Sequence, residues 1–309
     1  MVDNASDPVE IADVFAAKYE SLYSSVSYDE TDMKQLQEEI DILIRSESGM
    51  NGTCLPSHSI SCEKVNFAIS HLKCGKHDGD LGCYSDHIIH GTNRLNTYIS
   101  LLFTAMLKHG FSPKSFSNIA MHPIPKNKRK SLNDSENYRG IALSSILGKI
   151  LDWIILNDNF EILNSSELQF GFKPNSSTTQ CSFVLTECLH YYKSHGSNVH
   201  LVFVDASKPF DSVEYVKLFR LLLKRNICPL VIRLLLNMYI NQSISIVWGN
   251  AISKPFRCYN GVKQGGVLSP ILFSIYLDEL LMKLQKSSIG CHIGHILCQK
   301  RACFLYGST

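Results

Sequence analysis

The sequence predicts an α+β fold, because helical and strand-like segments alternate along most of the chain. Apolar residues recur at helical spacing over residues 9–23 and 94–109, which predicts two amphipathic helices. Short apolar runs over residues 119–125, 138–143 and 199–205 are bounded by Pro, Gly, Asn or Asp, which is typical of strands. We therefore expect a mixed arrangement of strands and helices.

The first 60 residues differ in charge from the rest of the chain. Residues 1–60 hold twelve Asp or Glu against three Lys or Arg. The helix at residues 9–23 is followed by a second acidic helix near residues 30–45 and by a Ser-, Gly- and Asn-rich break at residues 46–59. We therefore predict an acidic helical arm or linker, followed by a main domain over residues 61–309.

In the main domain, helical periodicity and turn residues set the expected order of elements. The helix over residues 94–109 should end at Gly110, because glycine accepts the left-handed conformation that closes many helices. Pro125 should end the first strand, and a polar loop should lead to the strand at residues 138–143. Further helices are expected over residues 61–73, 147–156, 212–225, 229–239 and 270–285, and further strands over residues 243–248 and 254–259.

Composition limits the class of protein. Hydrophobic residues make up 45% and charged residues 19%, which is typical of a globular protein and not of a disordered one. No uncharged apolar run reaches the roughly 18 residues of a membrane helix, and the acidic N-terminus does not resemble a signal peptide. Eleven cysteines without a disulfide framework favour a reducing compartment. We therefore expect an intracellular protein, nuclear or cytoplasmic, that is neither secreted nor membrane-bound.

Two aspartates lie at the end of the apolar run at residues 199–205 and just after it. Asp205 ends the run, where a carboxylate is well placed to hold Mg²⁺ at the edge of a sheet. An aspartate in that position also often caps a turn, so this alternative stays open. Asp211 precedes the helix expected at residues 212–225 and is interpreted as its N-cap.

A Gly-rich connector begins near residue 260. Gln264 could contact the edge of a nucleotide, and Gly265 and Gly266 allow a backbone to approach a ligand closely. The connector lacks the GxxxxGK[ST] spacing of a phosphate-binding loop, which argues against a Walker-type NTPase. A purely structural role for the glycines stays open.

A third segment carries positive charge. Lys126 and Arg139 flank a basic loop, and an ammonium and a guanidinium are both suited to a triphosphate. Residues 113–149 hold seven Lys or Arg against two Asp or Glu, which favours a phosphate-rich partner. Each cation taken singly could equally be an ordinary surface residue.

In this order, the segments resemble the reverse transcriptase domain of non-LTR (LINE-type) retrotransposons, over roughly residues 61–306. The matching stretches are IPK followed by NYRGIALSSILGKILD, then ELQFGFKPNSSTTQ, FVDASKPFDSV and GVKQGGVLSPILFSIYLDELL. KHDGDLG at residues 76–82 is a looser match, and the acidic arm resembles the linker that precedes the polymerase in such elements. The resemblance implies right-hand polymerase fingers and an incomplete palm, without a thumb.

The resemblance also implies nucleotidyl transfer by two metal ions, with an RNA template, a DNA primer and deoxynucleoside triphosphates (dNTPs) as partners. It assigns catalysis and metal binding to Asp205, with Mg²⁺ as the cofactor and Mn²⁺ as an alternative. Phe210 matches the bulky residue that rejects a 2′-hydroxyl group. The matches to the nucleotide pocket are Lys126, Arg139, Phe210, Gln264, Gly265 and Gly266.

The sequence departs from the family at two places. The family's next landmark is a hairpin with Tyr-Ala-Asp-Asp, whose aspartates complete the metal site, but here Gly-Ser-Thr follows Tyr306. No Asp or Glu follows Glu279, so we expect a truncated chain with little or no polymerase activity alone. Pro209 stands where the family usually has Ala, and proline disfavours the α region at Lys208, which could shift Phe210.

Three other interpretations stay open. A non-catalytic remnant could still bind RNA or DNA through its basic residues, with strong salt dependence. A group II intron maturase shares the motifs in outline, although KQGGVLSP is closer to the retrotransposon type. A zinc site could form from five residues that lack a CxxC pair, namely Cys74, His77, Cys83, His87 and His90.

Overall fold

The computed structural model describes residues 1–51, 59–78, 82–167, 169–173, 175–206, 208–287, 292–293 and 296–297. The chain folds into two compact units. The first comprises Met1–Ile162 and Phe210–Ser269, and the second comprises Leu163–Pro209 and Pro270–Thr309. Among the described residues, no helix combines the length and the apolar character that crossing a lipid bilayer requires.

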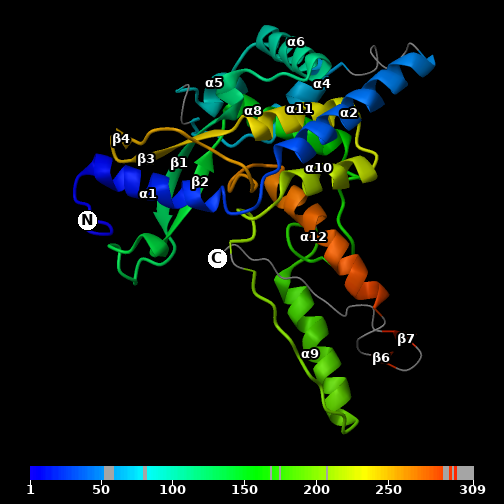
Figure 1. The fold of residues 1–309 in the computed structure, drawn as a ribbon. Coiled ribbons are helices and arrows are strands. Elements are labelled where there is room, and N and C mark those ends of the chain that lie inside the picture. Colours follow the sequence, from blue (N-terminus) through cyan, green and yellow to red (C-terminus); the bar gives the residue numbers. More distant parts are fainter. Residues whose placement is uncertain are drawn as a thin grey trace. The chain divides into compact units, whose positions relative to one another are not determined.

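The first unit contains a mixed sheet, which lies beside helix α1 (Pro8–Leu22; Figure 1). Its strands are β1 (Asn118–Pro125), β2 (Tyr138–Leu143), β3 (Ser243–Trp248), β4 (Ala251–Ile252) and β5 (Phe256–Arg257). β1 pairs antiparallel with β2, where Ile124 lies opposite Arg139, and parallel with β3, where Ile119 lies opposite Ile244. β4 and β5 both pair antiparallel with β3. The sheet therefore joins two distant parts of the sequence.

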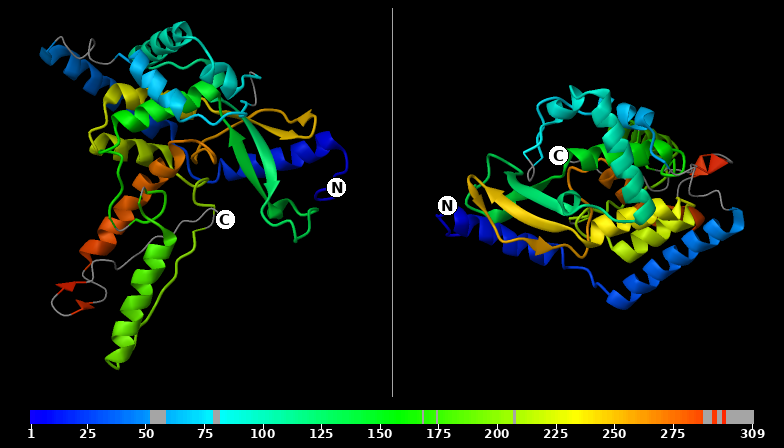
Figure 2. Two further views of the ribbon diagram at one scale, coloured as in Figure 1. Left: turned by 180° about the vertical axis from the view of Figure 1, so that it is seen from behind. Right: turned by 90° about the horizontal axis from the view of Figure 1, so that it is seen from above.

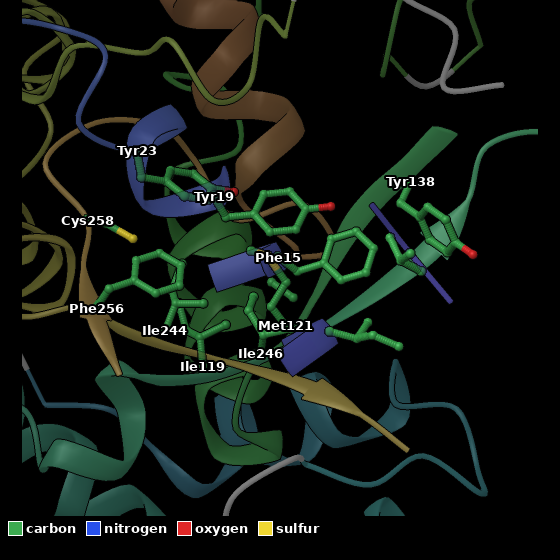
Figure 3. Close-up of a cluster of buried hydrophobic side chains, with 13 residues drawn as sticks. Phe15, Tyr19, Tyr23, Ile119, Met121, Tyr138, Ile244, Ile246, Phe256 and Cys258 are labelled. Carbon is green, nitrogen blue, oxygen red and sulfur yellow. The ribbon is translucent and has the colours of Figure 1, made fainter. Parts of the chain in front are cut away.

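Helix α1 (Pro8–Leu22) runs along one face of this sheet (Figures 1 and 2). The Asp7 carboxylate caps its first turn, and proline follows at the first helical position. Phe15 is 0% exposed, and its ring centroid lies 5.1 Å from that of Tyr138 and 5.3 Å from that of Trp248. The buried core around it (Figure 3) also contains Ile11, Tyr19, Tyr23, Ile119, Met121, Ile244, Ile246, Phe256 and Cys258.

A group of helices packs together elsewhere in the first unit (Figure 1). Its members are α2 (Glu30–Asn51), α6 (Asn93–His109), α10 (Tyr215–Lys224) and α11 (Pro229–Ile240). α11 contacts the other three because it is apolar on most of its surface. Gly110 ends α6 with a φ of 64°, a conformation that glycine adopts without a steric penalty.

Shorter elements complete the first unit. They are α4 (Cys62–Ser70), α5 (Ser85–Ile89), α7 (Lys114–Ser117), the 3₁₀ turn η1 (Ser135–Asn137) and α8 (Ile146–Asp158). α4 packs against both α6 and α8. The hydroxyls of Ser61 and Ser145 cap α4 and α8 by accepting backbone N–H groups.

The second unit contains α9 (Thr178–Ser194), most of α12 (Ser269–Lys286) and the strands β6 (His292–Ile293) and β7 (Ile296–Leu297). Polar contacts tie the segment before α9 to α12. Asp278 accepts the Ser166 N–H with both carboxylate oxygens at 3.1 Å, and the Gln169 amide donates to the Ser274 hydroxyl at 2.9 Å.

The predicted α+β class is confirmed, and so are most of its elements. The strand expected at residues 199–205 is wrong, because residues 197–206 form neither helix nor strand. Val202 and Phe203 are 86% and 80% exposed. A strand needs a neighbouring backbone for its hydrogen bonds, and no described strand pairs with this segment. The strand expected at residues 254–259 is shorter than predicted, because β5 contains only Phe256–Arg257. The sequence pattern did not predict helix α9.

The helices expected near residues 9–23 and 30–45 are present as α1 and α2, but α2 runs to Asn51, into the break expected at residues 46–59. α1 packs on the sheet and supplies part of its core, so it belongs to the same compact unit as the strands. A functional boundary near residue 60 stays a prediction.

Replacement of Phe15 by Ala tests how much α1 contributes to stability. Because the ring is fully buried against the sheet, we expect Phe15→Ala to lower the free energy of unfolding by about 3–5 kcal/mol. Urea unfolding followed by tryptophan fluorescence measures this change. Val9→Ala, at an exposed position of the same helix, is the control, and an equal loss in both variants would contradict the packing.

Candidate functional site

A buried carboxylate, that of Asp211, is held by side chains from two other segments. Asp211 is 4% exposed, and the Gln264 Nε2 atom donates to both of its carboxylate oxygens at 3.0 Å. The Tyr23 hydroxyl, just after α1, forms a hydrogen bond with the same carboxylate. Burial, followed by the nearby charge of Asp211, raises the pKa of Tyr23 well above its usual value, so the tyrosine stays a neutral donor.

This arrangement corrects the predicted N-cap role of Asp211. The N-cap of α10 is Glu214, three residues further on. Asp211 instead joins the Gln264 connector to the end of α1.

Asn260 ties the same turn to the N-terminal helix. Its side chain is 0% exposed, and its amide nitrogen donates to the backbone carbonyls of Leu22 and Asp211. The two backbone N–H groups that follow donate at 2.8 Å to carbonyls of the turn at residues 210–213. The connector and the turn are therefore joined by both main-chain and side-chain hydrogen bonds.

Gly261 permits this close approach. Its φ is 94°, and an added Cβ would lie 2.9 Å from the Tyr23 ring and 3.1 Å from the Asp211 backbone. The Tyr259 N–H donates to the Tyr23 carbonyl at 2.9 Å on the same side. No other residue type fits here without displacing Tyr23 or Asp211.

The connector also lies on the edge strand β2. The Ala142 N–H donates to the Gln264 carbonyl at 2.9 Å. Gly265 has a φ of 110°, and an added Cβ would lie 3.0 Å from the Ala142 carbonyl oxygen. A Cβ on Gly266 would lie 2.7 Å from the Ser269 hydroxyl at the start of α12. The two glycines thus have a structural role, and their predicted contact with a ligand stays a prediction.

Lys126 and Arg139 lie at the same end of the β1–β2 hairpin. The Lys126 N–H donates to the Asn137 carbonyl at 2.6 Å, and Arg139 lies opposite Ile124 in β1. The Lys126 side chain is exposed, and its ammonium donates to the Glu136 carbonyl at 3.0 Å. The structure therefore brings the two predicted triphosphate-binding residues together on one hairpin.

Asp152 and Lys263 are two further ionisable residues at the connector. Asp152 of α8 accepts the backbone N–H groups of Val267 and Leu268, and the Lys263 ammonium lies 5.9 Å from the Tyr239 ring centroid. Burial raises the pKa of Asp152 to about 6, although Lys263 opposes the shift. Burial also lowers the pKa of Lys263, and Asp152 opposes that shift in turn.

The predicted catalytic residue, Asp205, and the predicted sugar-discriminating residue, Phe210, belong to different units. Asp205 belongs to the second unit and is exposed in an irregular segment. Phe210 is buried in the first unit, and its carbonyl accepts the Val262 N–H. Lys208 has a φ of 48°, in the left-handed region and not in the extended region that a following proline favours.

Metal ligands do not converge in the described part of the chain. No three His, Cys, Asp or Glu side chains among those residues lie close enough together to hold a metal ion. The five residues of the zinc alternative are all described, so the structure gives this alternative no support. The segment expected to approach the Tyr-Ala-Asp-Asp hairpin, at residues 303–306, lies outside the described residues.

Sequence reasoning missed the two residues that organise this site most directly. Asn260 and Asp152 are isolated polar residues next to apolar or Gly-rich stretches, and their partners are far away in the sequence. The only sequence feature that could have indicated either residue is a polar side chain flanked by residues that become buried. Their interaction partners become neighbours only when the chain is folded.

The Asp152 carboxyl should make stability depend on pH. Its folded pKa of about 6 lies above the unfolded value of about 3.9, so the folded state prefers the protonated form. Between these values the folded chain binds more protons than the unfolded chain, and stability falls as pH rises. We expect Asp152→Asn to become progressively more stable relative to the natural chain from pH 4 to pH 6, with no further change above pH 7.

Urea midpoints of both chains at pH values from 4 to 8 measure this difference. Any loss of hydrogen bonding in the variant is independent of pH and appears as a constant offset. A difference that stays constant across the whole range would show that Asp152 does not titrate in this window.

Comparison with known proteins places these motifs in a family. Residues 124–299, more than half of the chain, match the model of the family described as reverse transcriptase (RNA-dependent DNA polymerase). The matched segment contains the last two residues of β1, all of β2, Asp205, Asp211 and the connector.

Relatives with established names come from transposable elements. The chain is 28% identical over 286 residues to the probable RNA-directed DNA polymerase from transposon BS of Drosophila melanogaster, covering 89% of this chain and 30% of the relative. It is 29% identical over 260 residues to the RNA-directed DNA polymerase from mobile element jockey of Drosophila funebris, covering 79% and 26%. The chain therefore spans less than a third of the length of these relatives, and their type agrees with the predicted retrotransposon type.

Proposed function

Because the chain belongs to the reverse transcriptase (RNA-dependent DNA polymerase) family, we propose that it supplies the nucleotide- and template-binding part of an RNA-directed DNA polymerase. The observation that carries this proposal is the position of the Gln264 connector. It is hydrogen-bonded to β2, the strand that also carries Arg139. A polar amide and a cation thus share one edge of the sheet.

The alternation of buried and less buried side chains along β2 supports this proposal. Arg139, Ile141 and Leu143 lie on the less buried face of the strand, and Tyr138 and Ala142 point into the core. A Cβ added to Gly265 would lie 3.9 Å from the Ile141 side chain, and Arg139 is two residues from Ile141, about 7 Å along the strand. That separation suits a nucleotide whose phosphates contact the cation and whose base or sugar contacts the connector.

The hairpin tip adds further charge. Between Lys126 and Lys130, four cationic side chains are exposed on the loop that leads to β2. Exposed cations attract the phosphates of a template–primer duplex and release its counterions, so binding should weaken with salt. An RNA template, a DNA primer and dNTPs are the partners that the proposal requires.

The family implies divalent metal ions, with Mg²⁺ as the expected ion and Mn²⁺ as an alternative. Metal-assisted nucleotidyl transfer needs several oxygen ligands, and the described residues offer Asp205 without two further ligands beside it. The described part of the chain therefore does not by itself supply the ligands of a two-metal site. Asp205 as the catalytic ligand and Phe210 as the sugar-discriminating residue remain parts of the proposal.

Removal of the two hairpin cations tests nucleotide binding. We expect the double variant Lys126→Ala, Arg139→Ala to bind dTTP, in the presence of an RNA–DNA template–primer, about tenfold more weakly or worse, because it loses charge-assisted contacts to the phosphates. Fluorescence titration with a labelled nucleotide measures the affinity. A matched pair of exposed cations, Lys34→Ala with Arg94→Ala, is the control. Equal weakening in both double variants would contradict the proposed site.

A non-catalytic nucleic-acid-binding protein is the second candidate, and the exposed cations of the hairpin tip favour it. Primer extension separates the two. We expect the chain alone to extend a primer little or not at all, and any extension must disappear in Asp205→Ala. Extension that survives this substitution would remove Asp205 from the proposed catalytic role.

A further inference from the structure

The Asp211 carboxylate restricts how the Gln264 side chain can be oriented. An amide has a donating and an accepting end, and exchanging them leaves its shape almost unchanged. A carboxylate, however, has only accepting oxygens. Because both Asp211 oxygens lie 3.0 Å from the Gln264 side chain, the NH₂ group must be the end that faces them.

A second donor also contacts the Asp211 carboxyl group, because the Tyr23 hydroxyl forms a hydrogen bond with it. Asn260 donates to the Asp211 backbone carbonyl and to Leu22, which fixes the main chain of the turn. Asp211 is therefore held close to the connector that carries Gln264.

The rest of Gln264 is also held in place. Its backbone carbonyl accepts the Ala142 N–H at 2.9 Å, so the residue is fixed at its main chain and at its Nε2 atom. The side chain is half-buried, and among the described residues no protein group donates to its Oε1 atom. The carbonyl oxygen is thus the end of the amide that a ligand can meet.

We propose that Asp211 is a positioning residue that fixes the Gln264 amide so that its carbonyl oxygen, and not its NH₂ group, is presented to the bound nucleotide or template. This inference rests on the proposed function of the connector. The group that Gln264 recognises must then be a hydrogen-bond donor, such as a hydroxyl of the sugar or an N–H of a base. An anionic phosphate oxygen is not a partner, because it would face another acceptor.

Asp211→Asn removes this restriction with almost no change of shape. An asparagine side chain both donates and accepts, so either end of the Gln264 amide can pair with it. We expect the variant to bind dTTP with template–primer about tenfold more weakly, the loss of one oriented hydrogen bond. Its melting temperature should stay close to that of the natural chain. Asp158→Asn, which removes a charge from the exposed end of α8, is the matched control and should bind normally.

A double-mutant cycle distinguishes positioning from a general structural role. Gln264→Met removes the amide but keeps the length of the side chain. If Asp211 acts through Gln264, Asp211→Asn adds no further loss of affinity in the Gln264→Met background. A full additional tenfold loss in that background would overturn the proposal, and so would unchanged affinity in Asp211→Asn alone.

A spectroscopic measurement separates this inference from the proposed function. In ¹H–¹⁵N spectra, the Gln264 side-chain NH₂ hydrogens should exchange slowly with solvent in the natural chain and at least tenfold faster in Asp211→Asn. If the natural chain binds neither template–primer nor dTTP, the proposed function fails, and the exchange rates still decide the orientation. Equally fast exchange in both chains would show that Asp211 does not hold the amide.

Discussion

The hydrogen bonds of one fully buried side chain, that of Asn260, connect the segments of the first unit that form the candidate site. Its nitrogen links the end of α1, through Leu22, to the turn that carries Asp211. Leaving this nitrogen unpaired would cost about 1–3 kcal/mol, so its two hydrogen bonds stabilise the arrangement of the three segments. These hydrogen bonds also help to position Gln264, because it follows Asn260 by only four residues.

The core under α1 holds this junction in place. Phe15 and Tyr19 fill the space between the helix and the sheet, and Tyr23 belongs to the same buried cluster (Figure 3). The Tyr23 hydroxyl forms a hydrogen bond with Asp211. Burial of these large aromatic side chains stabilises the packing of α1 on the sheet, and it places the Tyr23 hydroxyl beside the Asp211 carboxyl group. An acidic N-terminal helix therefore becomes part of the support of a site made by residues 210–266.

Local sequence patterns correctly predicted the features that depend on residues close together in the sequence. Helical spacing and a closing glycine identified α6 and Gly110, and proline marked the end of β1. The prediction for residues 199–205 failed because an apolar run becomes a strand only beside a partner, which local pattern does not reveal. Asp211 was misassigned for a similar reason, since a helix start nearby made capping the simplest explanation, whereas its actual partners come from α1 and the connector.

Amide hydrogen exchange of the ligand-free natural chain tests most directly whether the connector is built in advance. Three backbone N–H groups report on it, since Gly261 and Val262 donate to the turn and Ala142 donates to Gln264. The account predicts that all three exchange at least about a thousandfold more slowly than in an unstructured peptide, as amides of a stable core do. Exchange of these amides at the unstructured rate, in a chain whose β1–β2 amides are protected, would contradict it.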